Sequence, residues 1–391
     1  MNASFDVVIV GGGVTGAAVG YGLAKRGVKT CLVDAVPTFS RASRANMGLI
    51  WCQSKALGCP QFVRWGFASS RAYGKLAAEL KELSGIDTGY APTGGIIPCL
   101  GEAELEARAQ FIEKLRAETE DGTYPASVLS RKELEGMLPK VPFGPEVSGG
   151  IWSDMDGYVD PLHLMFAFRK SFVRLGGTLF AGERVSEVKP SGKGYTVVCG
   201  GRTLECGKAV LAAGLGVRKL AAQLGTDIPV FPNKSQVMLL ERIPADVLPI
   251  PLLGIARTFG GTVMIGAAHE NMGMDRRLTP EVLAANAQWA VRVWPELERK
   301  RILRFWTGLR VWPKDAYPIY DRIPGHENAF VFAMHSAVSL AAILEQALPD
   351  YVMGKPLPPG GAIFGLSRFA GGGSGFQGSA ASSPHAEAPN K

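Results

Sequence analysis

The stretch FDVVIVGGGVTGAAVGYGLAKRGVKTCLVD, residues 5–34, decides the fold. An apolar run at 7–10 predicts a short buried strand, the glycines after it a tight turn, and 17–25 a helix that stops at Gly27. A second apolar strand follows at 30–33 and is closed by Asp34. Strand, turn, helix and strand in this order form a βαβ unit, so we predict an α/β protein built on a Rossmann-like domain.

The glycine turn of this unit has the spacing of a dinucleotide-binding fingerprint. In Gly11-x-Gly13-x-x-Gly16 the missing side chains allow a tight turn and let the backbone approach a pyrophosphate at the helix N-terminus. Asp34 stands where a carboxylate accepts a hydrogen bond from a ribose hydroxyl, which disfavours the ribose phosphate of NADP. These residues leave FAD and NAD open, and a glycine turn without a ligand is the alternative. The cofactor contacts predicted in this unit are Gly11, Gly13, Val14, Thr15, Gly16, Asp34 and Ala35.

The rest of the chain mixes helices with short strands. The helices that we predict lie at 62–83, 101–118, 162–175, 280–294 and 340–354. Ser130, with Glu133 three residues later, predicts a capping box, and Pro161 begins the helix that follows it. Alternating residues between 226 and 310 indicate antiparallel strands. The predicted division is a discontinuous dinucleotide-binding domain of 1–85, 155–215 and 311–369, a substrate domain of 86–154 and 216–310, and a disordered tail of 370–391.

Composition and charge exclude several classes of protein. With 47% hydrophobic and 20% charged residues, the chain of 391 residues reads as an ordinary globular protein. Its net charge of +7 includes no basic cluster, so we expect no nucleic-acid partner. The six cysteines include no C-x-x-C pair and no histidine at ligand spacing, which indicates buried free thiols in a reducing cytoplasm and no metal site. Consecutive glycines and Asp6 argue against a signal peptide or a membrane span at the N-terminus, and peripheral attachment to a membrane through a partner stays open.

The stretch RFWTGLRVWP, residues 304–313, places a guanidinium among apolar residues. In a strand, the period of two puts Trp306, Gly308, Arg310 and Trp312 on one face. A charge on a largely apolar face needs a partner. The partner of Arg310 is either an acid of the protein, such as Asp315, or the carboxylate of a ligand.

Four separated stretches resemble one known family. They are VVIVGGGVTGAAVGYGLAKRG, ASRANMGLIW, AVLAAGLGV and RFWTGLRVWPKDAYPIYDRIP, and together they span nearly the whole chain before the tail. They resemble the amino-acid-oxidising flavoproteins, which include D-amino acid oxidase, glycine oxidase and sarcosine oxidase. Within this family, the chain is most similar in character to the dehydrogenases that act on opines or hydroxyproline. The resemblance implies a Rossmann-like FAD-binding domain with a second, mainly antiparallel β-sheet substrate domain. It implies non-covalent FAD, because nothing here matches the cysteine to which sarcosine oxidases tether their flavin.

The resemblance also implies roles for particular residues. In the family the arginine of the G-[LF]-R motif, here Arg310, binds the substrate carboxylate as a bidentate pair, for which a planar guanidinium is better suited than lysine. His335 lies in the segment that returns to the flavin ring and is a candidate catalytic base. Backbone N–H groups of that segment stabilise negative charge on the ring. The further flavin contacts implied are Ala42, Ser43, Met47, Gly48, Leu49, Val185, Gly214, His335, Ser336, Ala337, Val338, Ser339 and Leu340.

The implied reaction oxidises the C–N bond of an amino acid or secondary amine that bears a carboxylate, of D-amino acid, hydroxyproline or opine type. The product is an imine, formed by hydride transfer to flavin N5. The family's pocket tyrosine is replaced by Gly254 or Ile255, which favours a bulkier or N-substituted substrate. The lysine that sarcosine oxidases use towards oxygen is not visible, which favours a dehydrogenase that passes electrons to a partner subunit or a quinone. The alternatives are a flavin-binding non-catalytic subunit of a multisubunit amine dehydrogenase and an NAD-linked dehydrogenase.

Overall fold

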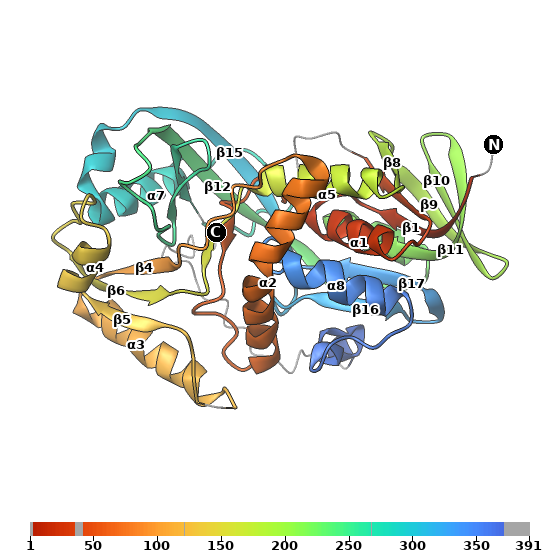
Figure 1. Cartoon of the computed structure of the whole chain (residues 1–391), viewed down its shortest axis with the longest axis horizontal. Helices are drawn as coiled ribbons and strands as arrows, with labels where there is room; N and C mark the ends of the chain where they lie inside the picture. The colour runs from red at the N-terminus through yellow and green to blue at the C-terminus, as the bar shows by residue number, and fades with distance from the viewer. Residues whose placement is uncertain (1–2, 36–41, 121, 267, 371–391) are drawn as a thin grey trace.

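The computed structural model describes residues 3–35, 42–120, 122–266 and 268–370. All of the predicted tail except its first residue lies outside the described residues. The two main sheets lie in opposite halves of the molecule (Figure 1).

The larger sheet contains the βαβ unit. Its strands are β1 (Ala3–Val10), β2 (Thr30–Asp34), β8 (Thr178–Ala181), β9 (Val185–Ser191), β10 (Gly194–Cys199), β11 (Arg202–Leu211), β16 (Ile319–Ile323) and β17 (His326–Ala333). They follow the order β16-β17-β11-β1-β2-β8, with the β9–β10 hairpin paired to β11. The strands from β17 to β8 are parallel neighbours, and β16 is antiparallel to β17.

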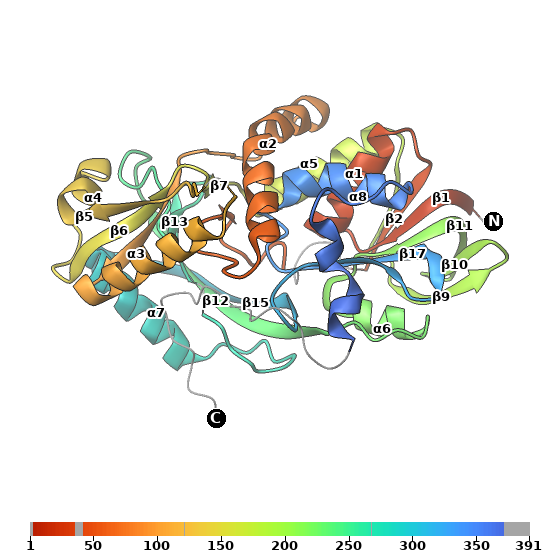
Figure 2. The same ribbon diagram turned by 90° about the horizontal axis from the view of Figure 1, so that it is seen from below.

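Both faces of this sheet are covered, which explains why its parallel strands read as continuous apolar runs. Val7 and Ile9 of β1 belong to the same core as three helices on one face, and Val8 and Val10 belong to a second core with a short helix and the β9–β10 hairpin. Figure 2 shows the three helices together above the sheet and the short helix below it. The three helices are α1 (Val14–Lys25), α5 (Pro161–Arg174) and α8 (Ala341–Val352), and the short helix is α6 (Val217–Ala222).

The second part of the molecule is built on antiparallel strands. A four-stranded sheet has the order β13 (Ile255–Arg257), β14 (Thr262–Gly266), β12 (Val230–Arg242), β15 (Ile302–Pro313). A three-stranded sheet has the order β4 (Gly95–Leu100), β6 (Val147–Ser153), β5 (Ser127–Ser130), and a bridge between Ile96 and Leu252 joins the two. The helices of this part are α3 (Glu102–Ala117), α4 (Arg131–Met137) and α7 (Pro280–Val293).

The long helix α2 (Pro60–Ser84) lies between the two halves and packs on α5 and α8 (Figure 1). A small pair of strands, β3 (Leu49–Ile50) and β7 (Gly157–Tyr158), also lies at this junction. Among the described residues, four short 3₁₀ segments lie at Gly214–Gly216, Pro295–Arg299, Gly361–Phe364 and Leu366–Phe369.

The predicted fold class and βαβ unit are confirmed. The five predicted helices are also present, and Ser130 and Glu133 form the predicted capping box. The division into domains stays a prediction. Helix α6, which that division assigns to the substrate domain, packs with Val8 against the larger sheet. Apolar residues of a short helix do not show from sequence which sheet they will cover.

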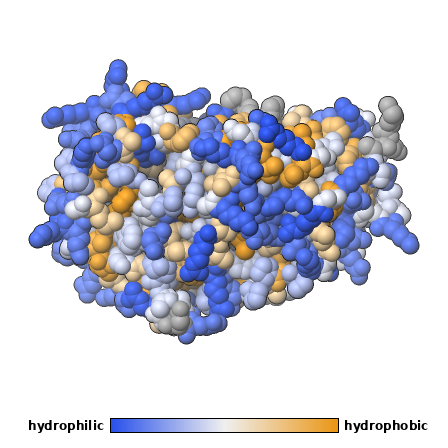
Figure 3. All heavy atoms as spheres, viewed as in Figure 1, coloured by the Kyte–Doolittle hydropathy of each residue, from blue (hydrophilic) through white to orange (hydrophobic). Residues whose placement is uncertain are grey.

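The cysteines, the helices and the visible surface bear on the expectations from composition. All six cysteines are buried and free, as predicted. No helix among the described residues is both long and apolar enough to cross a membrane. In Figure 3, hydrophilic side chains cover much of the visible face, and hydrophobic side chains form small scattered groups.

Candidate active site

The glycine turn is built so that a larger residue does not fit at two of its positions. Gly11 has φ +108°, and a Cβ on Gly16 would collide with the Gly11 carbonyl oxygen. Helix α1 begins after Gly13, which provides no side-chain cap, so the amides of its first turn face the turn. The Val14 N–H donates to Ser43 Oγ at 3.0 Å. The turn is therefore a narrow cradle of backbone donors, which fits the diphosphate of a dinucleotide.

Asp34 lies under this turn in a buried ion pair that the sequence analysis missed. Its Oδ2 accepts from the Gly12 N–H at 2.5 Å and from Arg169 Nη2 at 2.7 Å, and Arg169 Nε donates to the Gly12 carbonyl at 2.8 Å. Both side chains are buried. Arg169 lies on the same stripe of α5 as Met165 and Phe172, so a cation on an apolar stripe was the available signal. That Asp34 accepts from a ribose stays a prediction.

The loop at 42–49 contacts both the turn and the strand that carries the arginine. Ser43 reaches Val14 as described above, and Trp306 Nε1 donates to the Ala45 carbonyl at 3.4 Å. A Cβ on Gly308 would collide with the Ala45 Cβ, so glycine allows this loop to approach β15. Of the predicted loop contacts, Met47 and Gly48 are buried, whereas Ala42, Ser43 and Leu49 are half-buried.

The segment from His335 to Leu340 packs against the end of that loop. Ser339 Oγ accepts from the Trp51 N–H at 3.0 Å and donates to the Leu49 carbonyl at 3.3 Å. Tyr73 on α2 donates to the Val338 carbonyl at 2.8 Å. Helix α8 starts directly after Leu340. The structure therefore brings the glycine turn, the loop and the return segment together through contacts distant in sequence.

Two further predicted contacts lie at the rim of the larger sheet. Gly214, with φ +59°, follows the Ala212 and Ala213 backbone that lies against Gly11. Val185 begins β9, just after Gly182, whose N–H donates to the Asp34 carbonyl oxygen at 2.8 Å. Both are near the βαβ unit, and their roles stay predictions.

Arg310 is held by neutral acceptors. Its Nη1 donates to Asn233 Oδ1 at 2.9 Å and to the Ala268 carbonyl at 2.8 Å, and its Nη2 donates to Ser235 Oγ at 2.7 Å. Burial lowers the pKa of Arg310 to about 10, opposed by the charge of Glu270. Among the described residues no carboxylate lies within ion-pair distance of Arg310. Among the described residues, the guanidinium is thus a half-buried cation with no carboxylate at ion-pair distance.

The alternative that Arg310 pairs with Asp315 is wrong. The Asp315 carboxylate is held by Arg368, whose Nε and Nη2 lie 2.7 and 3.1 Å from its two oxygens. Both partners are buried. The strand ends at Pro313, and the chain turns away before Asp315, so nearness in sequence did not become contact.

Two neutral histidines flank Trp312 beside Arg310. The centroid of the Trp312 ring lies 5.3 Å from that of His269 and 4.7 Å from that of His335. Burial lowers the pKa of His269 to about 3, and burial with repulsion from Lys55, Arg310 and His269 lowers the pKa of His335 well below its usual value. His335 is thus at the site but neutral and a weak base, and its catalytic role stays a prediction. His269 was missed, because nothing in the sequence placed its loop opposite β15.

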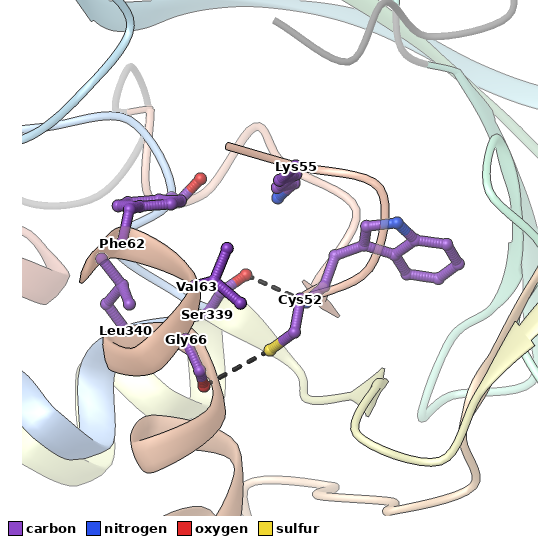
Figure 4. A pocket seen from close by; sticks show the side chains of 9 residues that line it. Cys52, Lys55, Phe62, Val63, Gly66, Ser339 and Leu340 are labelled. Atoms are coloured by element: carbon purple, nitrogen blue, oxygen red, sulfur yellow. Dashed lines mark hydrogen bonds between the residues drawn. The ribbon is translucent and has the colours of Figure 1, made fainter. Parts of the chain in front are cut away.

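Near the return segment the structure also places Lys55, which the sequence analysis did not single out. Lys55 lines a small pocket with Phe62, Val63 and Ser336, and Figure 4 shows it at the end of the pocket opposite Gly66. Burial lowers the pKa of Lys55. Sequence patterns gave no signal for it, because its side chain reaches the site from an irregular loop.

Gly254 and Ile255, the predicted replacements of the family's pocket tyrosine, lie just before and at the start of β13, and that replacement stays a prediction. Ile255 packs in the core beside Trp289, and Gly254 also lies against that indole ring. Ala256 belongs instead to a small buried cluster with Met47.

Comparison with known proteins gives the same picture over the length of the chain. The family model described as DAO, FAD dependent oxidoreductase, matches residues 6–344. The chain is 33% identical to one of the subunits of the opine oxidase of Agrobacterium tumefaciens, over 93% of this chain and 97% of that protein. It is 28% identical to a hydrogen cyanide synthase subunit of Pseudomonas aeruginosa, over 94% of this chain and 97% of that protein. The crystal structure of glycine oxidase from Geobacillus kaustophilus superposes with a TM-score of 0.87 at 27% identity, covering 95% of this chain and all of that one.

Proposed function

This chain belongs to the DAO family of FAD-dependent oxidoreductases, and on that premise we propose that it oxidises the C–N bond of a secondary amine bearing a carboxylate to an imine. The observation that carries the proposal is Arg310, a half-buried cation that donates only to neutral acceptors among the described residues. FAD, rather than NAD, is the cofactor of the family. The glycine cradle and the loop at 42–49 are the residues that would hold it.

Arg310 is suited to anchor the substrate carboxylate. Asn233 and Ser235 fix its plane from β12, so the fork does not have to be ordered when the substrate binds. A carboxylate supplies the anion that the protein does not place there, and a pair removed from water is stronger than a surface pair. This contact selects amino acids over plain amines.

The electrostatics of the site favour an uncharged amine. Arg310 is a cation, and the two imidazoles beside Trp312 are neutral. A positive potential disfavours a second positive charge, so the amine of a bound substrate loses its proton more readily than in water. The nitrogen lone pair is then available to form the C=N bond as hydride leaves the adjacent carbon, and the resulting iminium loses the remaining N–H proton. Bound FAD supplies the acceptor of that hydride.

We also propose a partner subunit as the route for electrons after the reaction. The support is that two relatives covering nearly the whole chain are described as subunits, of an opine oxidase and of a hydrogen cyanide synthase. A partner would take electrons from the flavin in place of oxygen. Slow peroxide production by the isolated chain, with fast turnover in the presence of an artificial electron acceptor, is the expected result.

The test of the main proposal is anaerobic mixing of the purified protein with candidate substrates while the flavin absorbance is recorded. The panel contains D- and L-amino acids, glycine, sarcosine, proline, hydroxyproline and opines, with decarboxylated amines as controls. Bleaching by carboxylate-bearing secondary amines and not by their decarboxylated controls supports the proposal. Bleaching by plain amines would contradict the proposal that Arg310 binds the substrate carboxylate. Persistent yellow colour with every compound favours the non-catalytic subunit instead.

A further inference from the structure

Lys55 is held in place by an unusual backbone. Its neighbours Ser54 and Ala56 have φ values of 53° and 66°, in the left-handed region that residues other than glycine rarely adopt. Such conformations cost free energy and persist only where the surroundings determine them. Ser336, with φ 66°, is another of these residues, and it lines the same pocket as Lys55. The strain is therefore concentrated around one lysine and the return segment.

Buried hydrogen bonds fix the loop that carries this lysine. The Cys52 and Gln53 N–H groups donate to Asp156 Oδ1 at 2.5 and 3.3 Å, and Gln53 Nε2 donates to Asp156 Oδ2 at 2.7 Å. The Ser54 N–H donates to the Tyr124 hydroxyl at 3.1 Å, and that hydroxyl donates to the Cys52 carbonyl at 3.3 Å. The backbone on the N-terminal side of Lys55 is thus fixed by two groups from distant parts of the chain.

Within the described part of the chain, the ammonium group that this loop presents pairs with no anion. Among the described residues it makes no hydrogen bond and no ion pair, although it is half-buried and lines the pocket. The carboxylate that acts on its charge is Asp156, whose oxygens already accept from the loop. An incompletely solvated cation without a partner is costly, so a ligand that brings an anion would be favoured.

Lys55 and Arg310 lie around the same histidine. Lys55 lines a pocket with Ser336, whose Oγ lies 3.0 Å from His335 Nδ1. The His335 ring in turn lies 4.7 Å from that of Trp312, two residues after Arg310 along β15. Repulsion from both cations lowers the pKa of His335, in agreement with this placement. The two come from different elements, Lys55 from the loop before α2 and Arg310 from β15. A ligand held by Arg310 at one end has a second cation available within the same site.

We propose that Lys55 is a specificity residue that binds a second carboxylate, so that the substrate is a secondary amine whose nitrogen joins two carboxylated carbons. The inference rests on the proposed function and adds its substrate class. Arg310 binds the carboxylate next to the oxidised carbon, and Lys55 binds the carboxylate of the other N-substituent. Compounds with one carboxylate leave Lys55 without an anion and bind less tightly.

The proposal has a pH signature. The titratable groups that act on the charge of Lys55 are Cys52 and Asp156. Lys55 and Arg310 both act on the charge of His335. A bound carboxylate favours the charged lysine and raises its lowered pKa, so a dicarboxylate binds with proton uptake. Its affinity falls as the pH rises through the pKa of Lys55, whereas the affinity of a monocarboxylate does not depend on Lys55.

The test uses two thioether ligands that have no amine to oxidise, so it does not depend on turnover. Thiodiacetate carries two carboxylates, and (methylthio)acetate carries one. Their dissociation constants are measured with the FAD-loaded protein by calorimetry and by the change in the flavin spectrum. We expect thiodiacetate to bind at least about tenfold more tightly, the order expected of one charge-assisted contact. Lys55→Met removes this preference without weakening (methylthio)acetate, Lys55→Arg keeps most of it, and Lys132→Met on the exposed face of α4 changes neither ligand.

Several results would overturn the inference. These are equal affinity of the unmodified enzyme for both ligands, an equal loss for both in Lys55→Met, or unchanged binding with an altered rate of flavin reoxidation, which would assign Lys55 to the electron acceptor. If Lys55→Met loses FAD, the pH dependence of thiodiacetate against (methylthio)acetate on the unmodified enzyme decides the matter. Failure of the proposed function looks different, because then neither ligand responds to Arg310→Met and no amine bleaches the flavin.

Discussion

Arg310 Nη1 and Asn233 Oδ1 lie 2.9 Å apart across the paired strands β12 and β15, at positions that face each other in the register of the sheet. The same amide oxygen lies 3.0 Å from His269 Nδ1. One acceptor oxygen thus orients both the cation and the neutral imidazole. Because Asn233 carries no charge, it positions the guanidinium without neutralising it, and the charge remains available to a substrate.

We predict that replacing Arg310 lowers substrate affinity and leaves FAD in place. Arg310→Lys keeps a charge but loses the planar fork, and Arg310→Met loses both, so kcat/KM should fall roughly 10–100-fold for lysine and further for methionine. Steady-state kinetics and the flavin-to-protein absorbance ratio measure the two effects. Arg304→Lys, at an exposed position of the same strand, is the control. Unchanged kinetics in both Arg310 variants would exclude the anchoring role.

Arg169→Met is expected to reduce FAD retention and stability together. The substitution leaves the buried Asp34 carboxylate and the Gly12 carbonyl without the guanidinium, and breaking a buried pair costs about 3–5 kcal/mol. Thermal unfolding and FAD content after gel filtration report the loss. Lys170→Met, at an exposed position of the same helix, should behave as the unmodified protein. Full FAD content in Arg169→Met would mean that the turn keeps its shape without this pair.

Gly308→Ala should disturb the flavin site from the substrate side. A Cβ there would collide with the Ala45 Cβ and push the loop at 42–49 away from β15, at a cost of about 1–3 kcal/mol. The expected result is weaker FAD binding, read as a higher dissociation constant when the apoprotein is titrated with FAD. Gly260→Ala is the matched control, because its nearest neighbour would be 3.8 Å away. Equal dissociation constants for the two variants would contradict the prediction.

The buried carboxyl group of Asp156 should make the free energy of unfolding depend on pH. Burial raises the pKa of its carboxyl from 3.8 to about 7, so the folded protein holds a proton that the unfolded chain has already lost. The free energy of unfolding therefore falls as the pH rises between these two values, by up to about 1.4 kcal/mol per pH unit, and the stabilisation is lost above the folded pKa.

Asp156→Asn keeps an acceptor oxygen but does not titrate, so this fall should be absent from it. Urea unfolding from about pH 5 to about pH 8 measures the difference between the two proteins. Asp154→Asn, at an exposed position nearby, is the control and should follow the unmodified protein. Parallel curves for Asp156→Asn and the unmodified protein would show that Asp156 titrates alike in the folded and unfolded chains.

Much of the fold was predictable because its signals are local. The period of two along β15 predicted that Trp306, Gly308 and Arg310 share a face. Their contacts agree with this, because Trp306 and Gly308 contact Ala45, and Arg310 contacts β12 and the loop after β14. The glycine spacing and the apolar runs around it predicted β1, α1 and β2, because turn geometry and strand burial depend on neighbouring residues. The same βαβ unit also implied that β1 and β2 are parallel.

The tertiary structure alone decided which partners the charged residues take. Asp34 meets Arg169, Asp315 meets Arg368 rather than Arg310, and Arg310 meets Asn233. Each pair joins segments that are distant in sequence, and a contact of that kind depends on strand register and on how helices cross, which no local period encodes. Lys55 is the clearest example, because its position depends on an irregular loop with left-handed residues on both sides of it. By itself the sequence determined the elements and the cofactor turn, and only their packing decided which cations were left for a substrate.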